Sequence, residues 1–361
     1  MAVRRTPAEW ASIAEAVVVD VLQSQGAFAP RELEAKAAEK QWSQYPTVNP
    51  HHLTQAVARL KSAGAIELQI GETRGGGLQR AYTLAGPSKV ALRAAGRKRL
   101  LLARYRSWAS VTKDWNPSPV GAALERVVHA SLTAAAPFGY RLLTADKGEV
   151  RELFGVRVPG GPLDNAAWFT GLDEGGMPLP PVLVLIEAKN LREWVYPRTQ
   201  ELYQLLDKAV SIQVAQPDVL ILPMLVCRRA HYTTGQMAKQ VGFHLATTTV
   251  QYVRPVVAGI KDGQRKVDEI IAELGFDIAL QEGETSLVRR QFEQTLPARI
   301  YDAAKRWQAV ALHPHVPDIV AQLRDEELLG DDRTYARDEF AGYVREALSE
   351  SDTPWASADH D

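Results

Sequence analysis

The stretch Val182-Leu-Val-Leu-Ile-Glu-Ala-Lys-Asn190 decides the fold expected for this chain. Five apolar residues in a row indicate a strand that is buried on both faces. Because side chains alternate along a strand, Glu187 and Lys189 at its end point to the same face. Two opposite charges at the end of a core strand are costly to desolvate, which favours a functional use of this pair.

Strands and helices are expected to alternate on both sides of this segment. The elements expected before it are a helix at 117–136, a strand at 140–144 and extended segments at 155–158 and 163–170. Those expected after it are helices at 197–214 and 233–241 and strands at 219–227 and 243–253. This alternation predicts a mixed α/β sheet whose two faces are covered by helices.

Two carboxylates upstream could join the strand-end pair. Asp164 stands near the start of an expected strand, and Glu125 stands on the helix that precedes the first strand. Asp173 and Glu174 are alternatives to Asp164 as the carboxylate that joins Glu187 and Lys189. They lie in a loop rich in glycine and proline, so their positions are less rigid.

The segment Glu187-Ala188-Lys189, with Asp164 and Glu125 before it, resembles the motif of the PD-(D/E)XK nuclease superfamily. Many restriction and repair endonucleases have this fold. The resemblance covers about residues 117–254, and it implies an α/β, restriction-endonuclease-like mixed sheet flanked by helices. The expected nuclease domain is 117–256.

The sequence departs from the family pattern at one position. The family often has a proline directly before the Asp, whereas this chain has Leu163 there and Pro162 one position earlier.

The resemblance implies a Mg²⁺-dependent phosphodiesterase, in which Mn²⁺ could substitute for Mg²⁺. A bound metal activates a water and neutralises the anionic transition state, and Mg²⁺ prefers oxygen ligands. The implied metal ligands are Asp164, Glu187, the carbonyl of Ala188 and, for a second ion, Glu125. Lys189 would position the attacking water, and Gln204, or its neighbour Tyr203, would support the site from the next helix.

The N-terminal residues 1–86 resemble a winged helix-turn-helix domain. Helices are expected at 7–24, 31–39 and 51–62, followed by a β-hairpin at 66–84 with a basic, glycine-rich tip. In that family the third helix enters the major groove and the wing touches the DNA backbone. The implied DNA contacts are His51, His52, Gln55, Arg59, Lys61, Arg74 and Arg80. A winged helix that binds another protein is the alternative.

Charge is distributed unevenly along the 361 residues. Residues 1–113 hold 17 Lys and Arg against 8 Asp and Glu, whereas the chain as a whole carries a net charge of -1. The basic helical connector 87–116 could follow DNA phosphates or be a solvated linker face. The acidic helical region 257–350 could form a homodimer, bind a partner protein or cover the basic face. Residues 351–361 are expected to be a disordered acidic tail.

Other features narrow the class of protein. Cys227 is the single cysteine and the N-terminus lacks the apolar core of a signal peptide, so a cytoplasmic location is expected. The apolar runs are too short to span a bilayer, so no membrane partner is expected. Gly75–Gly77 lack a following Lys-Ser/Thr, which argues against a P-loop. His313 and His315 have no evident further ligand and indicate a loop, while His129 could approach Glu125.

The expected function is a metal-dependent endonuclease that cuts double-stranded DNA. Such a pairing of domains suits restriction, phage defence or DNA repair. One alternative is a non-catalytic winged-helix regulator that binds DNA. Another is a nuclease directed at RNA, because the metal chemistry would be the same.

Overall fold

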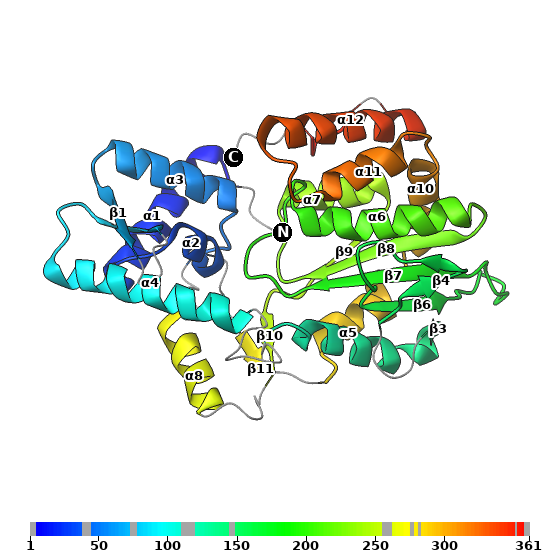
Figure 1. Ribbon diagram of the computed structural model, residues 1–361, viewed down its shortest axis with the longest axis horizontal. Coiled ribbons are helices and arrows are strands. Elements are labelled where there is room, and N and C mark those ends of the chain that lie inside the picture. The colour runs from blue at the N-terminus through cyan, green and yellow to red at the C-terminus, as the bar shows by residue number, and fades with distance from the viewer. Residues whose placement is uncertain are drawn as a thin grey trace.

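The computed structural model describes residues 5–37, 45–72, 78–109, 120–143, 149–254, 262–274, 278–280, 283–350 and 352–356. Within them the protein is a mixed α/β protein, as expected from the sequence. A smaller N-terminal unit lies beside a larger unit built around a five-stranded sheet (Figure 1). Among the described helices, none has the length and apolar character needed to cross a membrane.

The N-terminal unit consists of helices followed by an antiparallel hairpin. Its elements are α1 (Pro7–Gln25), α2 (Pro30–Ala37), α3 (Pro50–Ser62), β1 (Ile66–Glu72) and β2 (Leu78–Leu84). Thr6 begins α1 with a capping box that it shares with Glu9, and Gly26 ends it at a φ of 74° that favours glycine. Val18, Leu53 and Ile66 belong to one buried cluster, so these elements share a core of their own.

A long helix, α4 (Lys89–Ala109), connects the two units. It packs against β2 and against α8 (Gly263–Leu274), with Leu101 of α4 and Val267 of α8 in one buried cluster. The described part of the connector is therefore a helix held by both neighbours.

The larger unit is built on a sheet with an antiparallel half and a parallel half. Its strands, in spatial order, are β3 (Tyr140–Leu142), β6 (Asn165–Phe169), β7 (Val182–Lys189), β8 (Leu220–Cys227) and β9 (His244–Thr247). The pairs β3–β6 and β6–β7 are antiparallel, and the pairs β7–β8 and β8–β9 are parallel. The β6–β7 ladder ends at the pair Asn165–Ile186, one residue before Glu187.

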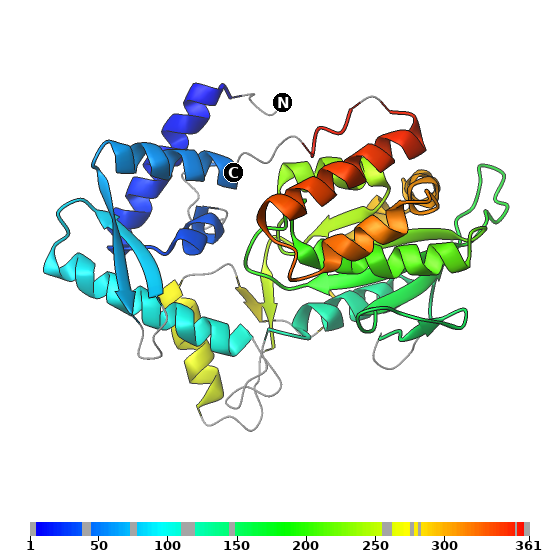
Figure 2. The same ribbon diagram turned by 45° about the horizontal axis from the view of Figure 1, so that its top comes forward.

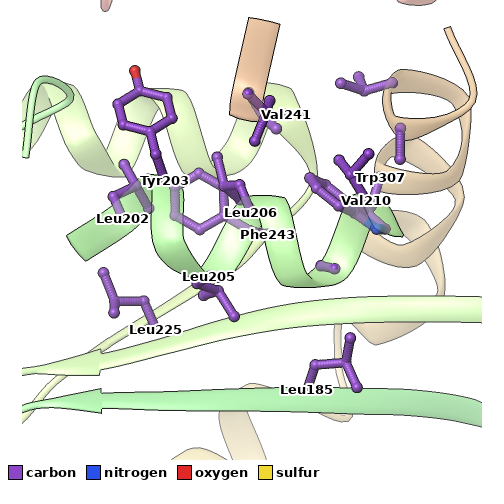
Figure 3. Packing of buried hydrophobic residues seen from close by; sticks show 14 of the residues in the cluster. Leu185, Leu202, Tyr203, Leu205, Leu206, Val210, Leu225, Val241, Phe243 and Trp307 are labelled. Atoms are coloured by element: carbon purple, nitrogen blue, oxygen red, sulfur yellow. The ribbon is translucent and has the colours of Figure 1, made fainter. Parts of the chain in front are cut away.

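Helices cover both faces of this sheet, as the apolar run of β7 requires. Val184 and Ile186 point to a cluster with α5 (Ala123–Ala134), α9 (Ser286–Arg290) and the π-helical turn Gln291–Thr295. Leu183 and Leu185 point to the opposite cluster, and Figure 3 shows Leu185 among its members. The helices on that side are α6 (Gln200–Ala215), α7 (Tyr232–Val241), α10 (Ile300–Ala311), α11 (Val316–Arg324) and α12 (Gly330–Leu348).

Several elements differ from the sequence expectation. The strand expected at 243–253 is split into β9 and β10 (Gln251–Val253), because Thr249 adopts a positive φ of 62° between them. β10 pairs in parallel with β11 (Ile278–Leu280) outside the main sheet. The segments β4 (Glu152–Leu153) and β5 (Val156–Arg157) form a short hairpin, of which only the second strand was expected.

The C-terminal helices share the core of the sheet. Trp307 of α10 and Phe340 of α12 are buried in the same cluster as Leu185 of β7. α10 packs directly on β8, whereas α11 packs on α6 and α12 on α11 (Figure 2). Trp355 is fully buried in this cluster, and its indole Nε1 donates to Gln240 Oε1 at 2.7 Å. This differs from the disordered tail expected for 351–361, because a tryptophan in an otherwise polar segment anchors residues 352–356.

Candidate active site

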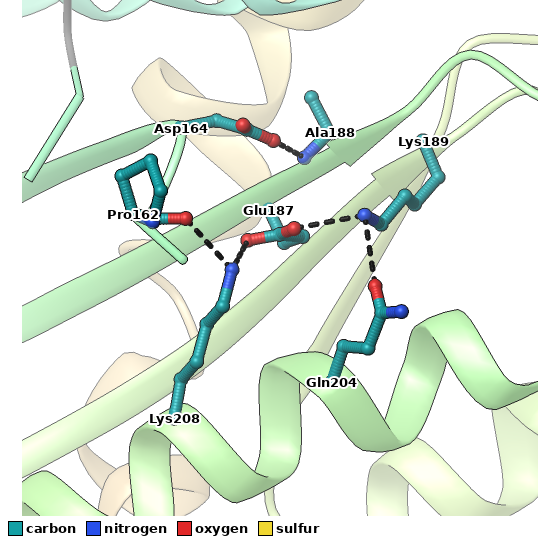
Figure 4. A network of polar contacts seen from close by, with 7 residues as sticks. All are labelled: Pro162, Asp164, Glu187, Ala188, Lys189, Gln204 and Lys208. Carbon is teal, nitrogen blue, oxygen red and sulfur yellow. Dashed lines mark hydrogen bonds and ion pairs between the residues drawn. The ribbon is translucent and has the colours of Figure 1, made fainter. Parts of the chain in front are cut away.

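The strand-end pair lies where β7 leaves its antiparallel neighbour. Glu187 is buried, and its Oε1 accepts a hydrogen bond from Lys189 Nζ at 2.8 Å (Figure 4). Lys189 Nζ also donates to Gln204 Oε1 on α6 at 3.3 Å. Glu187, Lys189 and Gln204, all singled out from the sequence, therefore form one chain of contacts between β7 and α6.

Asp164 joins the site from the segment just before β6. Its Oδ2 accepts a hydrogen bond from the backbone N–H of Ala188 at 2.6 Å, beyond the last β6–β7 pair. The carboxylate thus continues the ladder after the backbone pairing has stopped. In an extended strand the N–H and C=O of one residue point to the same side, so the Ala188 carbonyl also faces Asp164.

Glu125 approaches from α5, on the opposite face of the sheet from α6. It lies near enough to Glu187 and Asp164 for their charges to interact. His129, one turn further along α5, contacts Asn165 Oδ1 through Nδ1 at 2.8 Å. His129 therefore reaches the residue that follows Asp164.

Burial and neighbouring negative charge disfavour the charged forms of Asp164 and Glu125. Burial, followed by the charges of Glu187 and Glu125, raises the pKa of Asp164 to about 8. Burial and the charge of Glu187 likewise raise the pKa of Glu125. Burial opposes the charged form of Lys189, but Glu187 outweighs it through charge and a hydrogen bond, so the pKa of Lys189 lies above its ordinary value.

This donor set suits a hard cation. A bound cation would offset the burial and the nearby negative charges that raise the pKa values of Asp164 and Glu125. In the present conformation the described residues bring no three His, Cys, Asp or Glu side chains to one point. Mg²⁺ needs only one or two carboxylates, because it keeps several of its waters. Asp164, Glu187 and the Ala188 carbonyl meet that smaller requirement.

The competing acids lie at the other end of the β6–β7 pair. Asp173 Oδ1 accepts from the N–H groups of Gly175 and Met177, so this carboxylate stabilises the connecting loop. Tyr203 is fully buried and points away from the site, into the cluster that contains Phe340. Asp164 and Gln204 are therefore the better-placed members of these alternatives.

The described residues that were expected to contact DNA lie on α3 and on β2 of the N-terminal unit. Gln55 and Lys61 on α3 and Arg80 on β2 are exposed. Arg59 is exposed but forms an ion pair with Glu15 of α1 at 2.6 Å. Arg74 lies outside the described residues.

The two histidines of α3 do not face solvent freely. His52 stacks on Trp10 of α1, with ring centroids 5.4 Å apart. His51 lies 5.8 Å from the ring of His231 and 5.9 Å from that of Tyr232, at the start of α7 in the larger unit. Both side chains are partly buried. The sequence pattern could not show this, because it does not reveal which surface another unit covers.

Two residues of the site were not anticipated. Lys208 on α6 is buried and contacts both Glu187 and the Pro162 carbonyl. Its spacing of four residues from Gln204 places both on one helix face, and this was the available signal. Asn190 is also buried, and its side chain bonds the backbone of Val120 and Tyr252. It thereby anchors the chain directly after Lys189.

A cleft of about 610 Å³ opens beside Gln204 and Lys208. Its walls also include the turn at Pro159–Gly160, the last residue of α11, Arg324, and the residues Asp325–Glu327 that follow it. The C-terminal region therefore borders the candidate site as well as covering the sheet.

We compared the chain with protein-family models, with curated proteins and with solved structures, and none of these comparisons found a match.

Proposed function

We propose that this protein is a metal-dependent nuclease that hydrolyses phosphodiester bonds in double-stranded DNA. The observation that carries the proposal is the placement of Asp164 and Glu187 just beyond the last β6–β7 pair, with Lys189 bonded to Glu187. The mixed sheet, with this site at the ends of two antiparallel strands, supports a restriction-endonuclease-like fold. Three helices followed by a hairpin support a winged helix in the N-terminal unit.

The position of each site residue would determine its role in metal binding or in catalysis. Asp164, Glu187 and the Ala188 carbonyl would hold Mg²⁺ or Mn²⁺, and Glu125 would orient a second ion or its water. The metal would supply an activated water and neutralise the transition state. Lys189, which is less buried than Glu187, would contact the scissile phosphate and the attacking water. Gln204 holds the Lys189 amine in place.

Two variants test the proposal directly. We expect Glu187→Gln and Lys189→Met to lower cleavage by roughly 10²–10³-fold or more, because each removes a group that acts on charge in the transition state. Cleavage would be followed on a supercoiled plasmid and on a labelled linear duplex with Mg²⁺ or Mn²⁺, beside an RNA of the same sequence. Binding of the duplex, measured without metal, should persist in both variants.

Asp173→Asn is the matched control. It removes a carboxylate that bonds only loop N–H groups, so cleavage should remain. Full activity in Glu187→Gln would overturn the proposal. A preference for the RNA substrate would instead redirect it to an RNA nuclease.

A further inference from the structure

Lys208 is a buried cation with two polar contacts, and both belong to the candidate site. Its Nζ donates to Glu187 Oε2 at 2.9 Å and to the Pro162 carbonyl at 2.7 Å (Figure 4). The side chain is only 5% exposed. A charged amine is expensive to bury unless it is paired and hydrogen-bonded, and here the partners are the two segments that carry the site acids.

These contacts lie just beyond the point where the backbone pairing between β6 and β7 ends. Backbone pairing between β6 and β7 stops at Asn165–Ile186, so the ladder no longer holds Asp164 and Glu187 to each other, although β7 stays paired with β8. Two contacts cross the gap beyond that pair. The Ala188 N–H bonds Asp164 Oδ2, and Lys208 links the Pro162 carbonyl to Glu187 Oε2.

The two lysines on Glu187 differ in their access to a ligand. Lys189 binds Oε1 and its side chain is 19% exposed, whereas Lys208 binds Oε2 and is almost fully enclosed. Each oxygen of Glu187 therefore has one lysine partner, which fixes the plane of the carboxylate. Lys189 remains able to reach a substrate, while Lys208 is committed to the protein.

We propose that Lys208 is a positioning residue that sets the orientation of Glu187, and its separation from the 162–164 segment, for divalent-cation binding. This inference rests on the proposed function. Outer partners that orient metal ligands typically change metal affinity or activity by 10–100-fold when they are removed. Lys208 acts through Glu187 and does not contact the nucleic acid.

The sign of the change in metal affinity distinguishes positioning from simple charge. Removing a nearby positive charge should, by electrostatics alone, make a cation bind more tightly. Loss of positioning has the opposite effect, because the freed Glu187 carboxylate can rotate away. We therefore expect Lys208→Met to weaken Mn²⁺ binding by about 10-fold or more.

Mn²⁺ binding to the full-length protein without nucleic acid would be measured by calorimetry and by the electron paramagnetic resonance of free Mn²⁺. Cleavage by Lys208→Met should lose kcat with little change in KM for the duplex. Lys208→Arg, which keeps the charge and the donors, should recover much of the Mn²⁺ affinity. If Lys208→Met does not fold, Lys208→Gln retains a donor for Pro162 without a charge for Glu187 and permits the same comparison.

Lys98 supplies the matched control. It is also a buried lysine, and it is paired with Glu32 at 2.7 Å in the contact between α4 and α2. Lys98→Met should destabilise the protein while its Mn²⁺ affinity remains that of the wild type.

Unchanged or tighter Mn²⁺ binding in folded Lys208→Met would overturn the positioning role, and a raised KM at constant kcat would assign Lys208 to substrate contact instead. The proposed function fails separately. It fails if the wild type binds no Mn²⁺, or if Glu187→Gln binds it as well as the wild type does.

Discussion

The strand-end site and the surface of α3 differ in what fixes their side chains. Glu187 lies on a strand paired on one side along its full length, and Asp164 is bonded to the backbone of Ala188. On α3, by contrast, Arg59 is paired with Glu15 of another helix and His51 packs against a different unit. Backbone pairing can preorganise a site before any ligand arrives. A helix surface is organised by whatever packs against it.

The largest expected effect concerns Asp164. Asp164→Asn should lower Mg²⁺-dependent cleavage by about 10³-fold, because an amide is a poor substitute for a metal-binding carboxylate. The same change should make the metal-free protein more stable at pH 8. Burial raises the folded-state pKa of Asp164 to about 8, above its ordinary value, so the native protein holds a proton that the unfolded chain releases.

Stability contributed by this protonated carboxyl is therefore lost as the pH rises from about 4 to 8, and asparagine avoids that loss. Thermal unfolding of both proteins in chelator across this range would measure the difference, expected to be at most about 5 kcal/mol. An Asp164→Asn variant that is less stable than the wild type at pH 8 would contradict this prediction. It would mean that the fold does not hold the Asp164 carboxylate at a cost in stability, and the proposed contrast with the surface of α3 would be lost.

His244 is expected to make the folded protein less stable at acid pH, independently of the candidate active site. Burial, followed by the charge of Arg299, lowers the pKa of His244 on β9 to about 4. Because the folded-state value lies below the ordinary one, the unfolded chain binds more protons between about pH 6.5 and 4. The contribution of His244 to stability is complete above that range and is lost as the pH falls through it.

The loss should reach at most about 3 kcal/mol. Denaturant unfolding of the wild type and of His244→Gln from pH 4 to 8 would measure it, and the variant should show a shallower dependence. Identical dependence in the two proteins would assign the acid sensitivity to other groups. Because His244 affects stability only below about pH 6.5, a loss of cleavage above pH 6.5 would be attributed to the site and not to unfolding through His244.

The smallest expected effects lie on α3. Lys61 is exposed, so Lys61→Ala should weaken duplex binding by about 2–5-fold and reduce the dependence on salt by about one ion. Glu15→Ala should strengthen binding slightly, because it releases Arg59 from its ion pair. Fluorescence anisotropy with a labelled duplex at several salt concentrations would detect both. No change in either variant would argue that α3 does not face DNA.

The sequence predicted the parts of the site that follow from strand geometry. A two-residue period places Glu187 and Lys189 on one face, and an antiparallel partner brings Asp164 beside Ala188. It did not predict Lys208, because a lysine on a helix is usually solvated and its burial depends on the strand beneath it. It also could not show that His51 packs against α7, since the apolar pattern of one helix does not identify a distant partner.

The prediction of a disordered C-terminal tail differed from the structure for another reason. The composition of this segment is polar and acidic, and that average concealed the one residue that anchors it. Trp355 inserts into the core beside Phe340 and bonds Gln240, so a single side chain outweighs the surrounding charge. Composition describes a segment as a whole, whereas packing depends on individual residues.

The burial of Trp355 also constrains when the protein can complete its fold during synthesis. The N-terminal unit has a core of its own and can fold while later residues are still being made. The sheet that carries Glu187 is synthesised midway, but the side that α6 covers stays unfinished until Trp307, Phe340 and Trp355 have emerged from the ribosome. A nascent chain would therefore acquire its N-terminal unit early and the finished core of its larger unit only after residue 355.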